Sequence, residues 1–210
     1  MMMLIFSLAV TWALFSTASA LQCQTCTNSS DPACLSTTLV TCPSNSECLT
    51  ANIQGQQILK ACAPSAVCPA PGRQSFSFST SGTSVAINAQ CCNTDNCNTD
   101  IVGSPTLQSV NNLRCYSCDV TNPNCSIQIQ CKGVEDRCFR QTLVVGSVST
   151  LTLGCASANL CGAVSNLTSM AVFTNVSTFS CCGNNLCNSA PTTTTMSASI
   201  LLGLFLFLLY

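Results

Sequence analysis

The chain contains no histidine and very few charged residues. Its 210 residues include six Lys or Arg and seven Asp or Glu, which gives a formal net charge of -1. The most common general base is therefore missing, the carboxylates are scattered, and no G-x-S-x-G nucleophile motif appears. A charge near zero also gives no electrostatic attraction to nucleic acid. We expect a protein that is not an enzyme, uses no cofactor and binds no nucleic acid.

Cysteine is the residue that the chain has in excess, with 20 among its 210 positions. This density is typical of disulfide scaffolds in exported proteins, because cytosolic thiols are kept reduced. Cys23-x-x-Cys26 and Cys115-x-x-Cys118 have the spacing of redox or zinc sites. Neither pair lies at a predicted helix start that would lower a thiol pKa, and export disfavours free thiolates. We interpret both pairs as parts of structural disulfides and expect no metal site.

The first 20 residues form an apolar segment that ends in small side chains. The apolar run Leu4–Phe15 is followed by Ala18-Ser19-Ala20, which is typical of a secretory signal peptide that is cleaved after Ala20. The run is shorter than the about 20 residues that span a bilayer. We expect residues 1–20 to be removed in the secretory pathway, and the alternative is an uncleaved membrane anchor.

A second apolar segment, residues 197–210, ends the chain. As a helix it is too short for the roughly 30 Å hydrocarbon core, and no basic residue follows it. With the small residues and the polar spacer before it, it is typical of a glycosylphosphatidylinositol (GPI) attachment signal. We expect the lipid on Asn188, or as second choice on Ser189, and residues 189–210 to be removed. The protein would then lie on the outer leaflet of the plasma membrane; the alternative is a short spanning helix.

The region between these segments repeats one cysteine pattern. Each half contains ten cysteines; the short gaps between them agree in the two halves, and the long gaps differ. Disulfides at fixed positions, joined by loops of variable length, produce such a pattern. Each half is near the size at which a hydrophobic core alone gives marginal stability, and spacing alone leaves the disulfide pairing open. We divide this region into unit one, a linker and unit two, at residues 21–100, 101–112 and 113–188.

Alternating apolar and polar residues around short turns predict β-hairpins in the long gaps between cysteines. The turns are expected at Gln54–Gln56 and Ser81–Gly82 in unit one and at Gly146–Ser147 in unit two. No long 3.6-residue periodicity appears, so we predict an all-β, disulfide-rich fold. Phe76 and Phe78 alternate with serine, which favours an inward position over the alternative of exposed binding anchors.

Both units resemble the urokinase-receptor/lymphocyte-antigen-6 (LU) domain of the three-finger superfamily. The matching stretches open the units at Leu21–Cys26 and Leu113–Cys118 and close them at Cys91–Asn98 and Cys181–Asn188. Unit two departs from the pattern at Asn185, where an acid is expected and both residue types can cap backbone N–H groups. The resemblance implies two tandem three-finger domains, with the Asn after each last cysteine tying the chain back onto the knot.

The resemblance also implies the disulfide pairing, with every bridge inside its own unit. In unit one it joins Cys23 to Cys48, Cys26 to Cys34, Cys42 to Cys62, Cys68 to Cys91 and Cys92 to Cys97. In unit two it joins Cys115 to Cys138, Cys118 to Cys125, Cys131 to Cys155, Cys161 to Cys181 and Cys182 to Cys187.

The charges are densest at the base of the middle hairpin of unit two. We interpret this cluster as a solvated surface of mixed charge, with a partner-binding face as the alternative; its members are Lys132, Glu135, Asp136, Arg137 and Arg140.

Four N-x-S/T sequons predict N-glycosylation, at Asn28, Asn124, Asn166 and Asn175. Asn124 is the weakest of them, because early pairing of Cys125 would block it.

A disulfide knot with loops of free sequence is a scaffold for recognising other proteins. Our hypothesis is a GPI-anchored, non-enzymatic receptor or modulator that binds an extracellular or membrane protein; the sequence does not identify its partner-binding residues. The alternative is a secreted inhibitor, since the resemblance includes the two-domain phospholipase inhibitors of serum. Channel modulation of the toxin kind is disfavoured, because such ligands are usually single, basic domains.

Overall fold

The computed structural model describes residues 20–26, 31–118, 125–145, 148–169 and 176–189. The expected signal peptide, the expected GPI tail from residue 190 and the turn at 146–147 lie outside these residues. Within them, unit one contains β1 (Gln22–Thr25), β2 (Thr38–Thr41), β3 (Ser46–Ile53), β4 (Gln57–Pro64), β5 (Gly72–Ser79) and β6 (Ser84–Cys92). The linker and unit two contain β7 (Val110–Ser117), β8 (Ile127–Lys132), β9 (Arg137–Val145), β10 (Val148–Ala156), α2 (Ala158–Ser169) and β11 (Val176–Cys182).

The predicted hairpins are present. Strands β3 and β4 pair from Ser46 opposite Pro64 to Ile53 opposite Gln57, and the turn between them has positive φ at Gln54 (53°) and at Gly55 (73°). Strands β5 and β6 pair up to Ser79 opposite Ser84. Strands β9 and β10 pair along their whole length. The prediction of an all-β, disulfide-rich fold is therefore confirmed for the described part of the chain.

The larger strands of the two units form one continuous sheet. Its order is β11-β9-β10-β5-β6-β3-β4, while β1 pairs with β2 and β7 with β8 in two smaller sheets. The units join where β10 meets β5, with Cys155 opposite Ser79 and Ala156 opposite Phe78. The N–H of Ser157 extends this contact by donating to Ser77 O at 2.9 Å. The hydrogen-bonded sheet thus continues from one unit into the other without a break.

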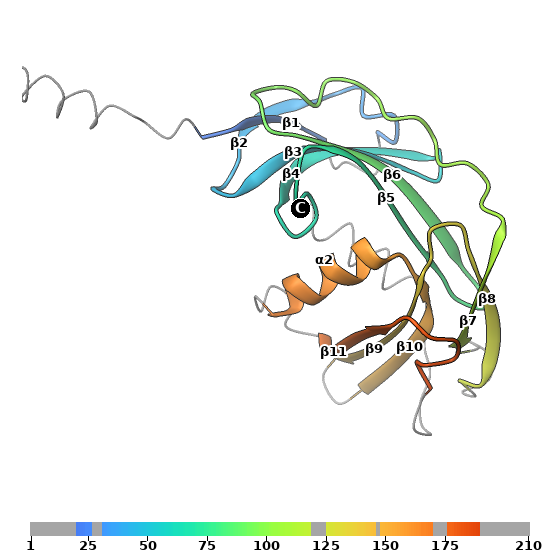
Figure 1. Ribbon diagram of the computed structural model, residues 1–210. Helices are drawn as coiled ribbons and strands as arrows, with labels where there is room; N and C mark the ends of the chain where they lie inside the picture. The colour runs from blue at the N-terminus through green and yellow to red at the C-terminus, as the bar shows by residue number, and fades with distance from the viewer. Residues whose placement is uncertain (1–19, 27–30, 119–124, 146–147, 170–175, 190–210) are drawn as a thin grey trace, which may run out of the picture.

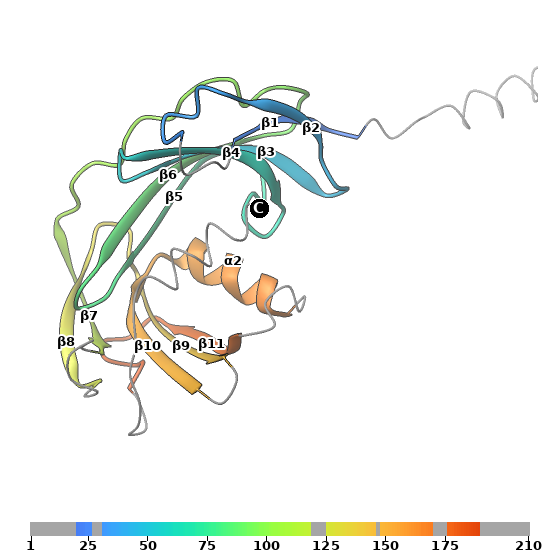
Figure 2. The same ribbon diagram turned by 180° about the vertical axis from the view of Figure 1, so that it is seen from behind.

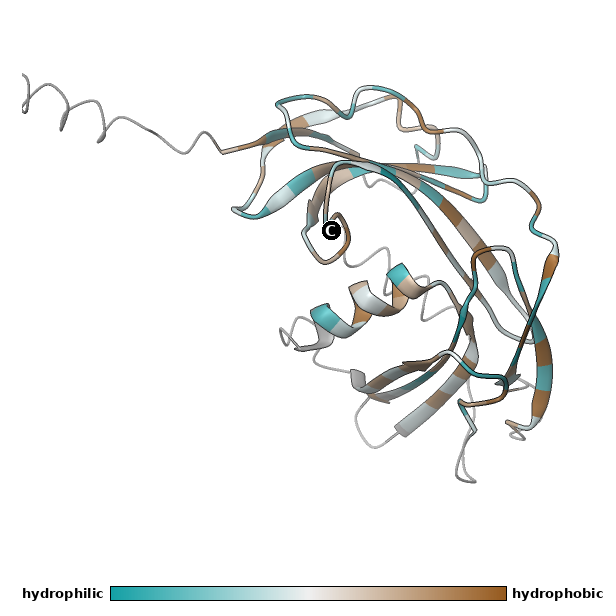
Figure 3. Ribbon diagram, in the orientation of Figure 1, coloured by the Kyte–Doolittle hydropathy of each residue, from teal (hydrophilic) through white to brown (hydrophobic). Residues whose placement is uncertain are grey.

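The joined sheet is strongly curved, and α2 lies on its concave side (Figures 1 and 2). The linker runs along the outer side of unit one before it enters β7. Hydrophobic and hydrophilic residues alternate along the strands, which is plainest on β8 (Figure 3). This period of two is the pattern expected of a strand with one buried face.

Helix α2 is not among the elements that the sequence predicts, and it is the one helix of the described residues. Leu160, Cys161, Ala163 and Val164 form its buried face. At its start, the N–H of Cys161 donates to Ser157 O at 3.0 Å. Asp136 Oδ1 accepts the N–H of Ala158 at 2.8 Å, which satisfies a helix-terminal donor and places a negative charge at the positive end of the helix dipole.

One hydrophobic core serves both units. Phe76 and Phe78 of β5 are 1% and 2% exposed and belong to the same cluster as Phe139 of β9 and the buried face of α2. The prediction that these two phenylalanines point inward is therefore confirmed. The core that they enter is, however, shared with unit two, so α2 stabilises unit one by covering its concave face.

Candidate protein-binding surface

All 20 cysteines are in disulfides, and the ten bridges have the pairing that the resemblance implies. None of them crosses the linker. The sulfurs of Cys23, Cys42 and Cys62 lie close together, as do those of Cys115, Cys131 and Cys155. Because each of these sulfurs is bonded to another, neither group offers a thiolate to a metal ion.

Two asparagines close the knots, each by the same set of hydrogen bonds. Asn98 Oδ1 accepts the N–H of Gln24 at 2.9 Å, and its Nδ2 donates to Gln24 O at 2.9 Å and to Leu49 O at 3.0 Å. Asn188 repeats this arrangement in unit two, with Tyr116 N, Tyr116 O and Phe139 O. Both side chains are buried, so their role is to hold the end of each unit onto its first strand.

In unit two, Asn185 stands where unit one has Asp95, and it makes the same hydrogen bond to the main chain. Asp95 Oδ1 accepts the N–H of Gln22 at 2.9 Å, and Asn185 Oδ1 accepts the N–H of Arg114 at 2.9 Å. An amide oxygen therefore suffices for this bond.

Glu135 is completely buried and bridges the two units. Its Oε1 accepts hydrogen bonds from Ser77 Oγ at 2.7 Å and from Ser79 Oγ at 2.6 Å, both on β5. Its Oε2 accepts the N–H of Lys132 at 2.8 Å. Burial raises the pKa of the Glu135 carboxyl above its ordinary value, although these hydrogen bonds oppose that change.

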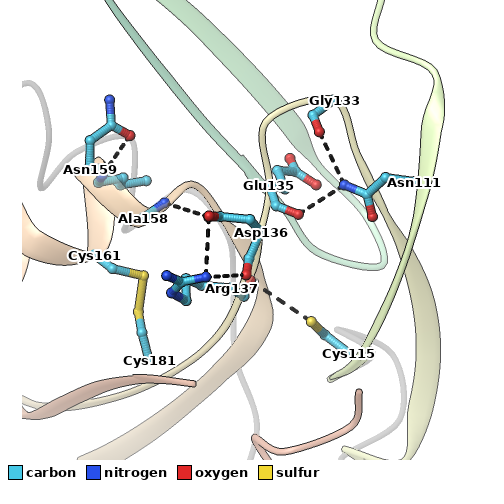
Figure 4. A network of polar contacts seen from close by, with 11 residues as sticks. Asn111, Cys115, Gly133, Glu135, Asp136, Arg137, Ala158, Asn159, Cys161 and Cys181 are labelled. Carbon is cyan, nitrogen blue, oxygen red and sulfur yellow. Dashed lines mark hydrogen bonds and ion pairs between the residues drawn. A yellow bond between two sulfur atoms is a disulfide. The ribbon is translucent and has the colours of Figure 1, made fainter. Parts of the chain in front are cut away.

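The charge cluster at residues 132–140 is thus not one solvated surface, and our interpretation is wrong for Glu135. Its neighbours Asp136 and Arg137 do form an exposed ion pair at 3.2 Å. Asp136 also caps α2, as Figure 4 shows, and Asn111 in the same view holds the main chain at Gly133 and Glu135. The cluster organises the junction between the units.

The other perturbed groups lie in unit one. Burial lowers the pKa of the Lys60 amino group, whose Nζ donates to Thr99 O at 2.5 Å. Burial raises the pKa of Glu47. Backbone N–H groups, first that of Ser36, lower the pKa of Asp31. These three groups lie apart along the chain, and Glu47 Oε2 is buried without a hydrogen-bond partner among the described residues.

The concave face of unit one carries the helix of unit two, so the accessible surface near the junction lies on the outer side. The linker follows this side through hydrogen bonds from Asn52 Nδ2 to Val102 O at 2.9 Å and from Asn88 Nδ2 to Gly103 O at 3.2 Å. Further along, Gln108 Oε1 lies 3.2 Å from Ser77 Oγ. The linker is therefore bound to unit one along its length.

Apolar side chains are exposed where the linker enters unit two. Leu107 is fully exposed, and Val110 and Val134 are 59% and 45% exposed. Val110 is paired with Lys132 across β7 and β8. Leu107 and Lys132 line one hollow, together with Gln54, Ser84, Ala86, Pro105, Thr106 and Gln108. We call Pro105, Leu107, Val110, Lys132 and Val134 the linker surface.

Most of the predicted modification sites lie outside the described residues: Asn28, Asn124 and Asn175. Asn166 is exposed on α2. At the end of the described chain, Asn188 is buried and the next residue, Ser189, is exposed. Within the described part of the chain, no helix is long and apolar enough to cross a membrane.

The fold is that of a tandem, disulfide-rich, all-β protein, and comparison with family models identifies both halves. The model of the u-PAR/Ly-6 domain matches residues 19–100, and that of snake toxin and toxin-like proteins matches residues 113–188. The chain belongs to the LU/three-finger family and consists of two tandem domains of this kind. A search of curated proteins gives no match to the chain. Domains of this family are generally protein-binding modules, which fits an extracellular or secreted protein.

Proposed function

We propose that the protein is a non-enzymatic receptor or modulator of the outer cell surface, anchored by a GPI lipid, that binds another protein through the linker surface. The carrying observation is Leu107, a leucine that is wholly exposed beside a hollow to which both units contribute. An exposed apolar side chain in a concave setting is typical of an interface anchor.

The arrangement of the units supports this placement. Because the concave face is covered by α2, a partner has access to the outer face without displacing the shared core. The linker is held by hydrogen bonds to β3 and β6, so it loses little conformational entropy when a partner binds. Lys132 contributes the one positive charge among the residues that line the hollow, which favours a partner that carries an acidic residue near an apolar one.

The binding proposal is tested by capturing surface proteins of neighbouring cells with the purified ectodomain. We expect Leu107→Asp to abolish capture of the partner that the wild-type ectodomain retains. Val144→Asp is the matched control, since Val144 is exposed in β9 and the change of charge is the same. Loss of capture with Val144→Asp, and not with Leu107→Asp, would move the binding site to the hairpin of β9 and β10.

The anchor is tested separately, by treating intact cells with a phosphatidylinositol-specific phospholipase. Release of the protein is expected, and mass spectrometry of its last peptide should find the lipid remnant on Asn188 or Ser189. Ser189 has the advantage of exposure, whereas the Asn188 side chain is already engaged by Tyr116 and Phe139. Retention on the cells, with Tyr210 still present in the mature protein, would refute the anchor. Appearance in the medium without any lipid remnant would favour the secreted inhibitor.

A further inference from the structure

In the described part of the chain, strand β2 (Thr38–Thr41) has an unpaired edge, and its side chains are more exposed than those of the corresponding strand in unit two. It pairs on one side with β1 and has no second neighbour among the described strands. All four of its residues are exposed, including Leu39 at 53% and Val40 at 42%. The corresponding strand of unit two, β8, is different, because its isoleucines are half-buried and only its glutamines are exposed.

This β2 edge lacks the devices that usually prevent strands from pairing with other chains. Natural edges carry Lys, Pro or a β-bulge. The stretch Thr38-Leu39-Val40-Thr41 contains neither residue, and its pairing with β1 is regular, without a bulge. An unprotected, apolar edge of this kind is suited to accept another strand.

The hydrogen bonds to β1 determine which main-chain groups face outward. The N–H of Cys42 donates to Leu21 O at 2.7 Å, and Thr38 O accepts from Thr25 Oγ1 at 3.1 Å, so residues 38 and 42 face β1. In an antiparallel pair the main-chain groups alternate in direction. The N–H and C=O groups of Val40 therefore also point toward β1, whereas those of Leu39 and Thr41 point away from it, to the open edge.

We propose that the β2 edge pairs antiparallel with the β2 edge of a second copy, with the two-fold axis at Val40. In this register, the N–H of Leu39 donates to Thr41 O of the second copy and the N–H of that Thr41 donates to Leu39 O. Symmetry repeats both bonds, so every outward-facing group of the two strands is satisfied. Val40 then lies opposite Val40, which places two β-branched side chains in a favourable cross-strand pair. The contact is isologous, as in most homodimers.

The position of the β2 edge leaves the rest of the molecule accessible. Both views place β1 and β2 at the end of the protein opposite β9, β10 and β11 (Figures 1 and 2). The dimer therefore leaves the end of the molecule that carries β9, β10 and β11 accessible on each copy. Since only one short strand from each copy takes part, we expect a dimer of modest affinity.

Single cysteine substitutions in the full, exported chain test the register. In the proposed dimer, the Cα atoms of the two Val40 residues form a non-hydrogen-bonded pair at about 4.5 Å, which a disulfide can bridge. The two Leu39 residues are diagonal neighbours at about 7–8 Å, which is too far. After mild oxidation we expect Val40→Cys to give a covalent dimer and Leu39→Cys to stay monomeric, while a mixture of Leu39→Cys and Thr41→Cys gives a mixed dimer. Cross-linking of Leu39→Cys with itself, or none with Val40→Cys, would overturn the register.

A second measurement avoids any extra thiol. Val40→Lys places two positive charges side by side at the axis, and Leu35→Lys is the control, since Leu35 is 83% exposed and lies outside β2. In sedimentation velocity on the ectodomain, we expect Val40→Lys to raise the dimer dissociation constant at least about tenfold, and Leu35→Lys to leave it within about twofold. A wild-type protein that is monomeric at all concentrations up to about 100 μM, where a dissociation constant of that size corresponds to weak association, would refute the dimer.

Discussion

Removing the Glu135 carboxylate should loosen the junction between the two units. Glu135→Ala removes the acceptor of three donors: the buried hydroxyls of Ser77 and Ser79 and the partly buried N–H of Lys132. The two hydroxyls retain second neighbours, since Gln108 Oε1 and Ser84 Oγ each lie at 3.2 Å. The Lys132 N–H donates to Glu135 Oε2, so it loses this hydrogen bond outright.

The expected cost follows from these partners. An unsatisfied buried donor costs about 1–3 kcal/mol, and the hole left by the side chain adds to this. We expect Glu135→Ala to lower the free energy of unfolding by about 2–4 kcal/mol. Glu135→Gln keeps an acceptor for the serines but turns an NH₂ group toward the Lys132 N–H, so about 1–2 kcal/mol is expected. Asp136→Ala is the control: its exposed cap of α2 is worth about 1 kcal/mol.

The raised pKa of Glu135 also determines how this residue makes the free energy of unfolding depend on pH. A carboxyl with a raised pKa in the folded protein binds protons more tightly there than in the unfolded chain. Its contribution to stability is therefore fully present below the ordinary Glu pKa, about 4.3, and is lost as the pH rises through the folded pKa. Burial raises the pKa of Glu47 as well, so Glu47→Gln is needed to separate the two contributions. With that background, Glu135→Gln should flatten the remaining pH dependence in this window.

Two measurements check this prediction. Guanidinium unfolding without reductant gives the free energies, and hydrogen exchange followed by mass spectrometry gives the local opening of β5 and β10. We expect Glu135→Ala to speed exchange of the Ser157 N–H, which donates to Ser77 O, and of the Ser77 N–H, which donates to Ser157 Oγ. Unchanged stability together with unchanged exchange at these positions would refute the view that Glu135 holds the units together.

Two further predictions concern the same junction. Gly154→Ala places a Cβ 2.1 Å from Ser79 O and should cost more than about 2 kcal/mol by chemical unfolding, as overpacking of a tight contact does. Gly162→Ala meets nothing within 4 Å and should instead stabilise α2 by up to about 1 kcal/mol. A protease site introduced between residues 106 and 107 should yield halves that stay together in native buffer, because they share one core, and separate in denaturant without reductant, because no disulfide crosses the linker. Separation in native buffer would contradict the shared core.

The part of the fold that could be predicted from the sequence is the part with local signals. Ser75, Ser77 and Ser79 alternate with Phe76 and Phe78, and the two phenylalanines are buried as this period of two requires. The turn at Gln54–Gln56 was predictable from Gly55, which has φ of 73°. The structural role of Asn98 came instead from the resemblance to the LU domain, and its amide makes three main-chain hydrogen bonds.

Helix α2 was missed although its sequence carries a weak signal. Leu160, Ala163 and Val164 have the spacing of one helix face, but Gly162 interrupts them and the helix has only 12 residues. A helix of this length is marginal in isolation. Its stability comes from packing on β5 and β11 and from the cap supplied by Asp136, which lies 22 residues away in the sequence. The decisive contacts are therefore long-range, and a search for local periodicity does not detect them.

Glu135 shows the same limit for the candidate site. A glutamate beside Asp136 and Arg137 in the sequence is expected on the surface, since an isolated buried carboxylate is costly. The hydroxyls that compensate this cost belong to Ser77 and Ser79, 58 and 56 residues earlier, in the other unit. Two exposed-looking serines and a charged residue thus become interior partners only when β5 and β10 are joined, which no pattern within either unit reveals.

The joining of the units also limits where a partner can bind. In a single three-finger unit, the concave face of the large hairpins would be open to a ligand. Here that face of unit one holds Leu160 and Val164 of α2 in a common core with Phe76 and Phe78. Displacing the helix would expose these side chains to solvent, so a partner that entered the concave side would have to compensate the loss of this shared core. The outer side requires no such displacement, and there Leu107 is already exposed. One unit thus closes the inner face of the other, and this is why we place the proposed binding site on the linker surface.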